Sequence, residues 1–153
     1  MKGIVAFGFF MLFLAALALT NLGNMTPAET EALRAPTPLE LSGERWQLVA
    51  LRNVQGVSTA NIELQFTRGG TVTGHSRCQH FTAQYQLADG ALAISEIDAL
   101  PTSCQDAVLA IEAALLQVFS QTRTVGVDER NLVLLGDESV RLARFVPQGA
   151  AAP

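Results

Sequence analysis

At 153 residues, the chain has room for one folded domain with short extensions. Its formal net charge is −4, and its nine arginines are scattered between Arg34 and Arg144 without forming a run. This distribution argues against a nucleic-acid-binding protein, which needs a basic patch, and against a polybasic membrane-surface site.

Residues 1–23 have the organisation of an export signal. Lys2 is followed by an uncharged, largely apolar run from residue 3 to residue 19, as in a secretory signal peptide. As a helix, about 17 residues span roughly 25 Å, and extension to Leu22 approaches the roughly 30 Å of a bilayer core. Two alternatives stay open: cleavage after Ala18, or retention of residues 3–22 as an inner-membrane anchor. A buried core helix is a third, which would need polar interruptions or a partner.

Both of the first two alternatives export the domain, and we expect it in a bacterial periplasm. No cysteine follows the apolar run, so the lipobox of a lipoprotein is missing. Residues 24–39 are rich in Thr, Pro, Ala and Glu and are expected to form a linker. The folded domain is expected to span residues 40–146, and residues 147–153 a disordered tail.

Apolar and polar residues alternate through most of the domain, which is the period of half-buried strands. Ile62, Leu64 and Phe66 show the pattern most clearly, and Asp89-Gly90 is a two-residue hairpin signal. Further apolar positions with this alternation are Trp46, Leu48, Ala50, Val72, Phe81, Ala83, Tyr85, Leu87, Leu92, Ile94, Val125, Val127 and members of the runs 132–135 and 140–145.

One segment has helical rather than strand periodicity. Its apolar residues are Val108, Ile111, Leu115, Val118 and Phe119. Ser103 and Asp106, three residues apart, resemble a capping box at its start. We therefore expect a mostly β (α+β) domain: a curled antiparallel sheet, or partial barrel, with one amphipathic helix packed on it.

Cys78 and Cys104 both lie in the exported part, where an oxidising compartment favours a disulfide. The chain-entropy model gives such a bridge, which closes about 26 residues, roughly 3.5 kcal/mol. A redox-active pair is disfavoured, because the sequence has no C-x-x-C motif. Two free thiols or a metal site are the remaining alternatives.

His75, Cys78 and His80 form an H-x-x-C-x-H cluster that contains both histidines of the chain. Sulfur and imidazole ligands suit copper or zinc. On one regular strand, however, residues 75 and 80 would point to opposite faces, and only a turn or bulge near Arg77 would bring them together. The competing interpretation is a surface loop that happens to hold two histidines.

No residue constellation specifies a reaction. The sequence has no G-x-S-x-G elbow, and its two histidines are the sole candidates for a histidine base. Large aromatic residues are expected to fill the core, although a curled sheet also has the shape to leave an apolar ligand cavity. We expect no catalytic residues, no cofactor and no enzymatic activity.

Several segments of the chain, taken in order, form a recognisable sequence pattern. They are Gly43-Glu44-Arg45-Trp46-Gln47-Leu48, Gly74-His75-Ser76-Arg77-Cys78-Gln79-His80-Phe81, Leu100-Pro101-Thr102-Ser103-Cys104, the helix positions Glu112, Leu115, Leu116 and Phe119, and the closing Leu132-Val133-Leu134 and Leu142-Ala143-Arg144-Phe145. Together they resemble the META domain of HslJ-like heat-inducible lipoproteins, over about residues 44–145. Arg77, Gln79 and Leu100 depart from the family's usual glycine, asparagine and threonine. If that glycine serves a turn with positive φ, Arg77 implies a different backbone geometry.

The resemblance implies an architecture and an envelope location, with little chemistry. Family members are loosely linked to heat response, envelope stress and antibiotic tolerance. We expect a non-enzymatic module for envelope stability, stress or protein interaction, with an unidentified envelope protein as partner and possible inner-membrane anchoring through the N-terminal segment. The alternative is a periplasmic module that binds a small ligand or a metal.

Overall fold

The computed structural model describes residues 33–100 and 103–148, so the expected export segment, 1–23, lies outside it. Within the described residues, no helix is both long and apolar enough to cross a membrane. The elements, in chain order, are α2 (Pro38–Gly43), β1 (Arg45–Leu51), η1 (Val57–Ala60), β2 (Glu63–Phe66), β3 (Thr71–His75), β4 (His80–Ala88), β5 (Ala91–Ala99), α3 (Asp106–Gln121), β6 (Thr124–Asp128), β7 (Asn131–Leu135), η2 (Asp137–Ser139) and β8 (Arg141–Pro147).

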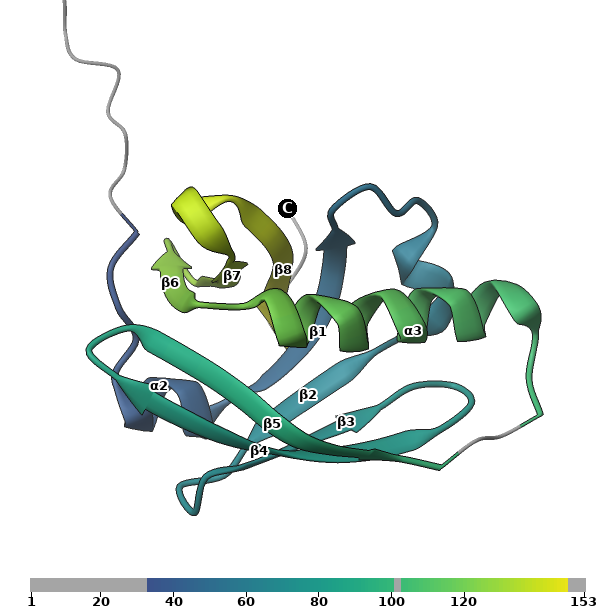
Figure 1. Cartoon of the computed structure of the whole chain (residues 1–153), viewed down its shortest axis with the longest axis horizontal. Coiled ribbons are helices and arrows are strands. Elements are labelled where there is room, and N and C mark those ends of the chain that lie inside the picture. Colours follow the sequence, from purple (N-terminus) through teal and green to yellow (C-terminus); the bar gives the residue numbers. More distant parts are fainter. Residues whose placement is uncertain (1–32, 101–102, 149–153) are drawn as a thin grey trace, which may run out of the picture. The chain divides into compact units, whose positions relative to one another are not determined.

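The strands form a closed antiparallel barrel in which each strand pairs with its neighbours in sequence, and β8 pairs with β1 (Figure 1). The barrel is held by very few strand contacts at one place, between β5 and β6. β5 and β6 share a single residue pair, Ala91 with Thr124, and β5 then runs away from β6. The predicted mostly β fold with one packed helix is confirmed, and this weak joint explains why the helix is needed.

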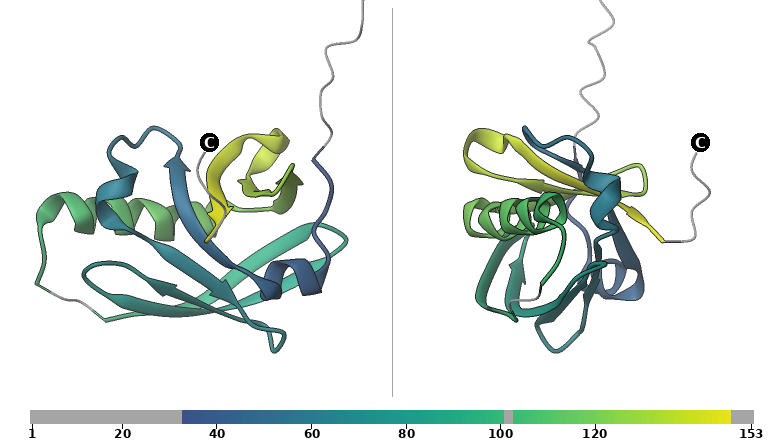
Figure 2. Two further views of the ribbon diagram at one scale, coloured as in Figure 1. Left: turned by 180° about the vertical axis from the view of Figure 1, so that it is seen from behind. Right: turned by 90° about the vertical axis from the view of Figure 1, so that its right-hand side faces the viewer.

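Helix α3 covers the opening beyond this joint, between β5 and the strands β6–β8 (Figure 2). It contacts β5, η1 and β8. Its apolar stripe is buried as the periodicity predicted, with Leu115 fully covered, and the ring of Phe119 lies 5.8 Å from that of Phe81 on β4. Burying each such side chain contributes about 1.5–3 kcal/mol, so the stripe is what holds the helix in the opening.

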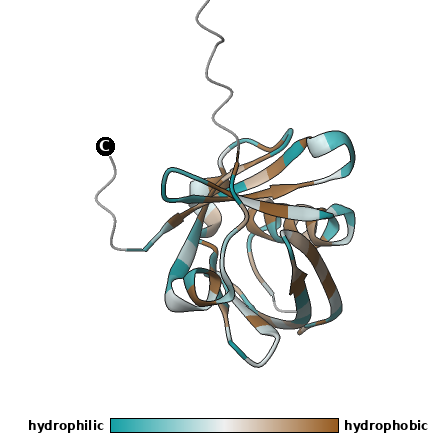
Figure 3. Ribbon diagram, turned by 90° about the vertical axis from the view of Figure 1, so that its left-hand side faces the viewer, coloured by the Kyte–Doolittle hydropathy of each residue, from teal (hydrophilic) through white to brown (hydrophobic). Residues whose placement is uncertain are grey.

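The predicted alternation is confirmed along β2, β3 and β4. It is not found along β6 and β7, where three and four successive residues are buried. Along β4, exposed residues alternate with the buried Phe81, Ala83 and Tyr85, and hydrophobic and hydrophilic stretches alternate along the ribbon (Figure 3). Inward side chains from strands and helix form one cluster that fills the barrel. Asp89 and Gly90, at φ 49° and 82°, make the predicted tight turn, because both positions need a left-handed backbone.

Two features near helix ends differ from expectation. Ser103 and Asp106 do not form a capping box: α3 begins after Gln105, whose side chain makes no capping bond. A capping box does form at α2, which spans the expected boundary between linker and domain, and there Thr37 and Glu40 bond each other's backbone N–H groups. The signal for it, Thr followed by Pro at the first helical position and Glu two residues later, is present in the sequence.

The segment leading into α2 is attached to the barrel. Arg34 exchanges two backbone hydrogen bonds with Val127 on β6. Its guanidinium binds both carboxylate oxygens of Glu40 at 2.9 and 2.6 Å. This hydrogen bonding from Arg34, together with bonds from Thr37, lowers the pKa of Glu40 to about 2. The indole of Trp46 donates to the carbonyl of Leu41 at 3.0 Å, which fixes α2 against the first strand.

Replacing Gly74 tests how tightly the barrel is packed. Gly74 faces Phe81 across β3 and β4, and an added Cβ would lie 1.8 Å from the Phe81 ring. Gly74→Ala should therefore lower the free energy of unfolding by about 1–3 kcal/mol, measured by denaturant titration. Gly43→Ala is the matched control, because a Cβ there meets no atom within 4 Å. Equal stabilities of the two variants would contradict this account.

Candidate functional site

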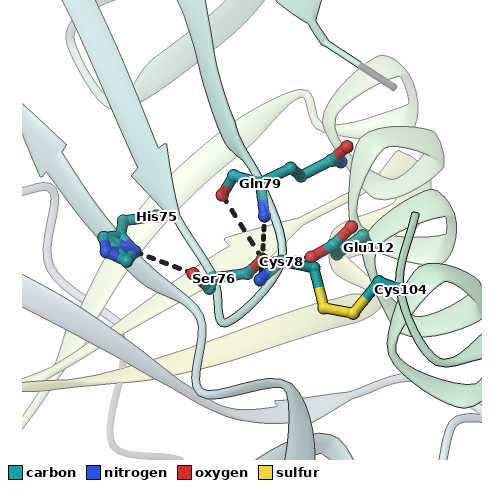
Figure 4. Close-up of a disulfide and its surroundings, with 6 residues drawn as sticks. All are labelled: His75, Ser76, Cys78, Gln79, Cys104 and Glu112. Carbon is teal, nitrogen blue, oxygen red and sulfur yellow. Dashed lines mark hydrogen bonds between the residues drawn. A yellow bond between two sulfur atoms is a disulfide. The ribbon is translucent and has the colours of Figure 1, made fainter. Parts of the chain in front are cut away.

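The turn between β3 and β4, residues 76–79, contains a polar network next to the disulfide (Figure 4). The hydroxyl of Ser76 accepts hydrogen bonds from the backbone N–H groups of Cys78, at 3.0 Å, and Gln79, at 3.1 Å. The N–H of Ser76 donates to the carbonyl of Gln79, and that of Arg77 donates to the carbonyl of Ala60, the last residue of η1. The turn is therefore closed on itself and attached to a second loop.

A buried carboxylate supports the turn from below. Glu112 lies on the inward side of α3, and its Oε1 accepts a hydrogen bond from the hydroxyl of Ser76. Both residues are 2 % exposed. Glu112 Oε2 is buried without a hydrogen-bond partner among the described residues. A buried carboxylate that is only half satisfied costs free energy, so this position is not optimised for stability alone.

The position of Glu112 in the sequence indicates that it is buried, although the spacing of the apolar residues alone does not single it out. Residues 108, 111, 115, 118 and 119 define the buried stripe, and position 112 falls within it. An acidic residue on an apolar stripe either is buried with a partner or breaks the stripe. Its partner, Ser76, is 36 positions away and therefore not identifiable from spacing.

The disulfide connects the same two elements. Cys78 in the turn is bonded to Cys104, two residues before α3, with their Cα atoms 5.8 Å apart, within the usual range for a disulfide. Both cysteines are partly buried against the core. A covalent bond and a buried hydrogen bond thus hold the β3–β4 turn to α3.

The histidine cluster is arranged differently from a three-ligand site. The sulfur of Cys78 is used in the disulfide. His75 and His80 lie on different strands, directly opposite each other, with ring centroids 4.3 Å apart. The turn at 76–79 therefore brings them to one face, where a single continuous strand would have separated them. No group of three His, Cys, Asp or Glu residues suited to a metal occurs in the described part of the chain.

The backbone at Arg77 needs no positive φ. The left-handed non-glycine residues are elsewhere, for example at Asn61 and Glu96, so an arginine fits this turn without strain. The glycine with a steric role is Gly74, whose missing side chain makes room for the Phe81 ring. This pairing gives a physical reason for a glycine and a phenylalanine seven positions apart in the motif.

The Ser76–Glu112 pair is not accessible to a substrate. A serine beside a carboxylate suggests nucleophilic chemistry, but catalysis requires that the hydroxyl reach a bound molecule. At 2 % exposure, neither side chain does so. The hydroxyl also accepts two backbone hydrogen bonds. The arrangement is suited to fixing the turn.

Glu112 variants should separate turn order from overall stability. In Glu112→Leu the stripe becomes fully apolar, so the free energy of unfolding should be unchanged or higher. The turn loses its hydrogen bond, however, and amide exchange at Cys78 and Gln79 should rise by roughly tenfold. Glu112→Gln keeps an acceptor for Ser76 and should retain slow exchange. Unchanged exchange in Glu112→Leu would contradict the supporting role.

Removing the disulfide should cost more than any single hydrogen bond. A Cys78→Ala, Cys104→Ala double variant should unfold with a free energy about 3.5 kcal/mol lower than the oxidised protein, by the loop-entropy estimate. The wild-type protein under reductant is the control and should match the variant. A count of two reactive thiols on the unreduced native protein would contradict the bridge itself.

Comparisons with known proteins agree with this architecture. The family model of the META domain matches residues 39–149. An NMR structure of a protein from Burkholderia xenovorans is 23 % identical, with a TM-score of 0.61, over 81 % of this chain and 97 % of that one. A crystal structure of a DUF4847 family protein from Bacteroides vulgatus is 13 % identical, with a TM-score of 0.57, over 69 % of this chain and 93 % of that one. At these identities the two structures support the fold alone.

A search of curated proteins finds no match to the chain. The family model, in contrast, covers most of the chain and includes the whole barrel from β1 to β8, with α3 and both cysteines. The chain therefore belongs to the META domain family.

Proposed function

We propose that the protein is a non-enzymatic META module outside the cytoplasm, where it binds another envelope protein and contributes to envelope stability or stress tolerance. The N-terminal sequence pattern supports export. The disulfide supports an oxidising compartment, because such bonds are rare where thiols are kept reduced. In a bacterium this compartment is the periplasm, with the apolar segment either removed or retained as an inner-membrane anchor.

The main support for a role in protein interaction is that the β3–β4 turn is held in one conformation by bonds within the protein. Within the turn, the buried Ser76 is hydrogen-bonded to the buried Glu112 of α3, and Cys78 is bonded to Cys104. Arg77, at the tip, is exposed and makes no ion pair with any described residue. A loop ordered in advance loses less conformational entropy when a partner binds.

An exposed apolar residue lies near this turn. Leu100 follows β5 and is 71 % exposed. It is close to the start of β4, because the preceding residue, Ala99, pairs with Phe81. We call Arg77 and Leu100 the turn surface. Arginine is enriched in protein interfaces relative to the rest of the protein surface.

Crosslinking in intact cells tests the interaction. Full-length tagged protein, crosslinked in the envelope and purified, should co-purify with one specific protein. Arg77→Glu should reduce that recovery by at least roughly tenfold, the effect of losing about 1.4 kcal/mol of binding free energy. Arg68→Glu is the matched control: Arg68 is also exposed and in a turn, but in the one that precedes β3.

Three outcomes would contradict the proposal. Equal recovery with Arg77→Glu and wild type would remove the turn surface from the interaction. Repeated absence of any specific crosslinked protein would contradict the interaction role. Recovery of the wild-type protein from the cytoplasmic fraction would contradict export, on which the proposed interaction with an envelope protein depends.

A further inference from the structure

His75 and His80 occupy the position in an antiparallel pair where side chains come closest. Along the β3–β4 ladder, hydrogen-bonded residue pairs alternate with non-hydrogen-bonded pairs. Hydrogen-bonded pairs lie at its two ends: the N–H of Ser76 donates to the carbonyl of Gln79, and the N–H of Tyr85 donates to the carbonyl of Gly70. Counting from either end, His75 and His80 form a non-hydrogen-bonded pair, for which Cα atoms are about 4.5 Å apart. Both side chains are exposed, and their ring centroids are 4.3 Å apart.

The hydrogen bonding of His75 prepares one of its nitrogens for coordination. Its Nδ1 lies 2.8 Å from the carbonyl oxygen of Ser76. A carbonyl only accepts, so in the neutral ring Nδ1 carries the proton and Nε2 retains a free lone pair. Histidines that bind metals commonly have this arrangement, in which the outer hydrogen bond fixes both tautomer and ring orientation.

The carbonyl that orients His75 is itself held in place. Ser76 belongs to the turn that Glu112 and the Cys78–Cys104 disulfide attach to α3. The imidazole is thus positioned by a turn that is bonded to α3 and to the segment before it. Prior positioning of this kind lowers the cost of bringing two ligands to one ion.

We propose that His75 and His80 together chelate one divalent ion of the copper, nickel and zinc group. Two imidazole nitrogens are ligands that suit these metals. The affinity should be higher for copper than for zinc or nickel. The disulfide excludes Cys78 as a ligand, so the site differs from a sulfur-containing one. Water completes the coordination, because no third protein ligand is arranged there among the described residues. This inference does not depend on the proposed interaction role.

Titration of the oxidised full-length protein with Zn²⁺ and Cu²⁺ tests the site. Zn²⁺ should bind with one-to-one stoichiometry and shift the imidazole NMR signals of His75 and His80 together. Cu²⁺ should bind more tightly and broaden the same signals. Thiol assay of the sample should give no free cysteine, which keeps Cys78 out of the measurement.

Single and double variants distinguish chelation from two independent histidines. Cu²⁺ binding should be weakened at least roughly tenfold in each single variant, His75→Ala and His80→Ala, because one imidazole cannot form the chelate. The double variant, which has neither imidazole, should bind at least as weakly. Amide spectra should show that all three remain folded. Arg68→His, which adds an isolated exposed histidine, should not strengthen binding. Retention of Cu²⁺ affinity within about twofold in either single variant would overturn the proposal, as would imidazole signals that stay unchanged with Zn²⁺.

Discussion

The packing of α3 into the opening beyond the β5–β6 joint is the interaction on which the rest of the structure depends. One residue pair, Ala91 with Thr124, closes the ring between these strands. Without the helix, the inward faces of β4 and β5 would meet water at that side, including Phe81, whose ring lies 5.8 Å from Phe119. The barrel is closed as much by apolar side chains as by backbone hydrogen bonds.

The same helix carries the least favourable group in the core. Glu112 interrupts an otherwise apolar stripe, and one of its oxygens is unsatisfied within the described residues. A leucine would fit the stripe better, so the acid is explained by what it orders rather than by what it stabilises. Through Ser76 it determines the conformation of the β3–β4 turn, and the turn in turn determines where Arg77, His75 and His80 lie.

The sequence was sufficient for the repetitive part of the fold. Alternation located the strands, the i, i+3, i+4 spacing located α3, and Asp89-Gly90 located one hairpin, because these signals are local. The turn at 76–79 has neither glycine nor proline, so the sequence left a turn near Arg77 as one alternative and did not decide whether His75 lies opposite His80. The Ser76–Glu112 bond was equally hidden, since it joins residues far apart in the chain. Proline content made residues 36–38 resemble a linker, although Thr37 and Glu40 cap a helix there.

The attachment of residues 34–40 has a mechanical consequence. The described chain begins at the end of the barrel opposite the β3–β4 turn (Figures 1 and 2). There, Arg34 is bonded to the backbone of Val127 and to the side chain of Glu40. A force applied to the chain ahead of Leu33 would load these bonds and α2 before it reached β1. The barrel would thus be protected from tension at its N-terminal strand, while the β3–β4 turn would face away from the point of pull.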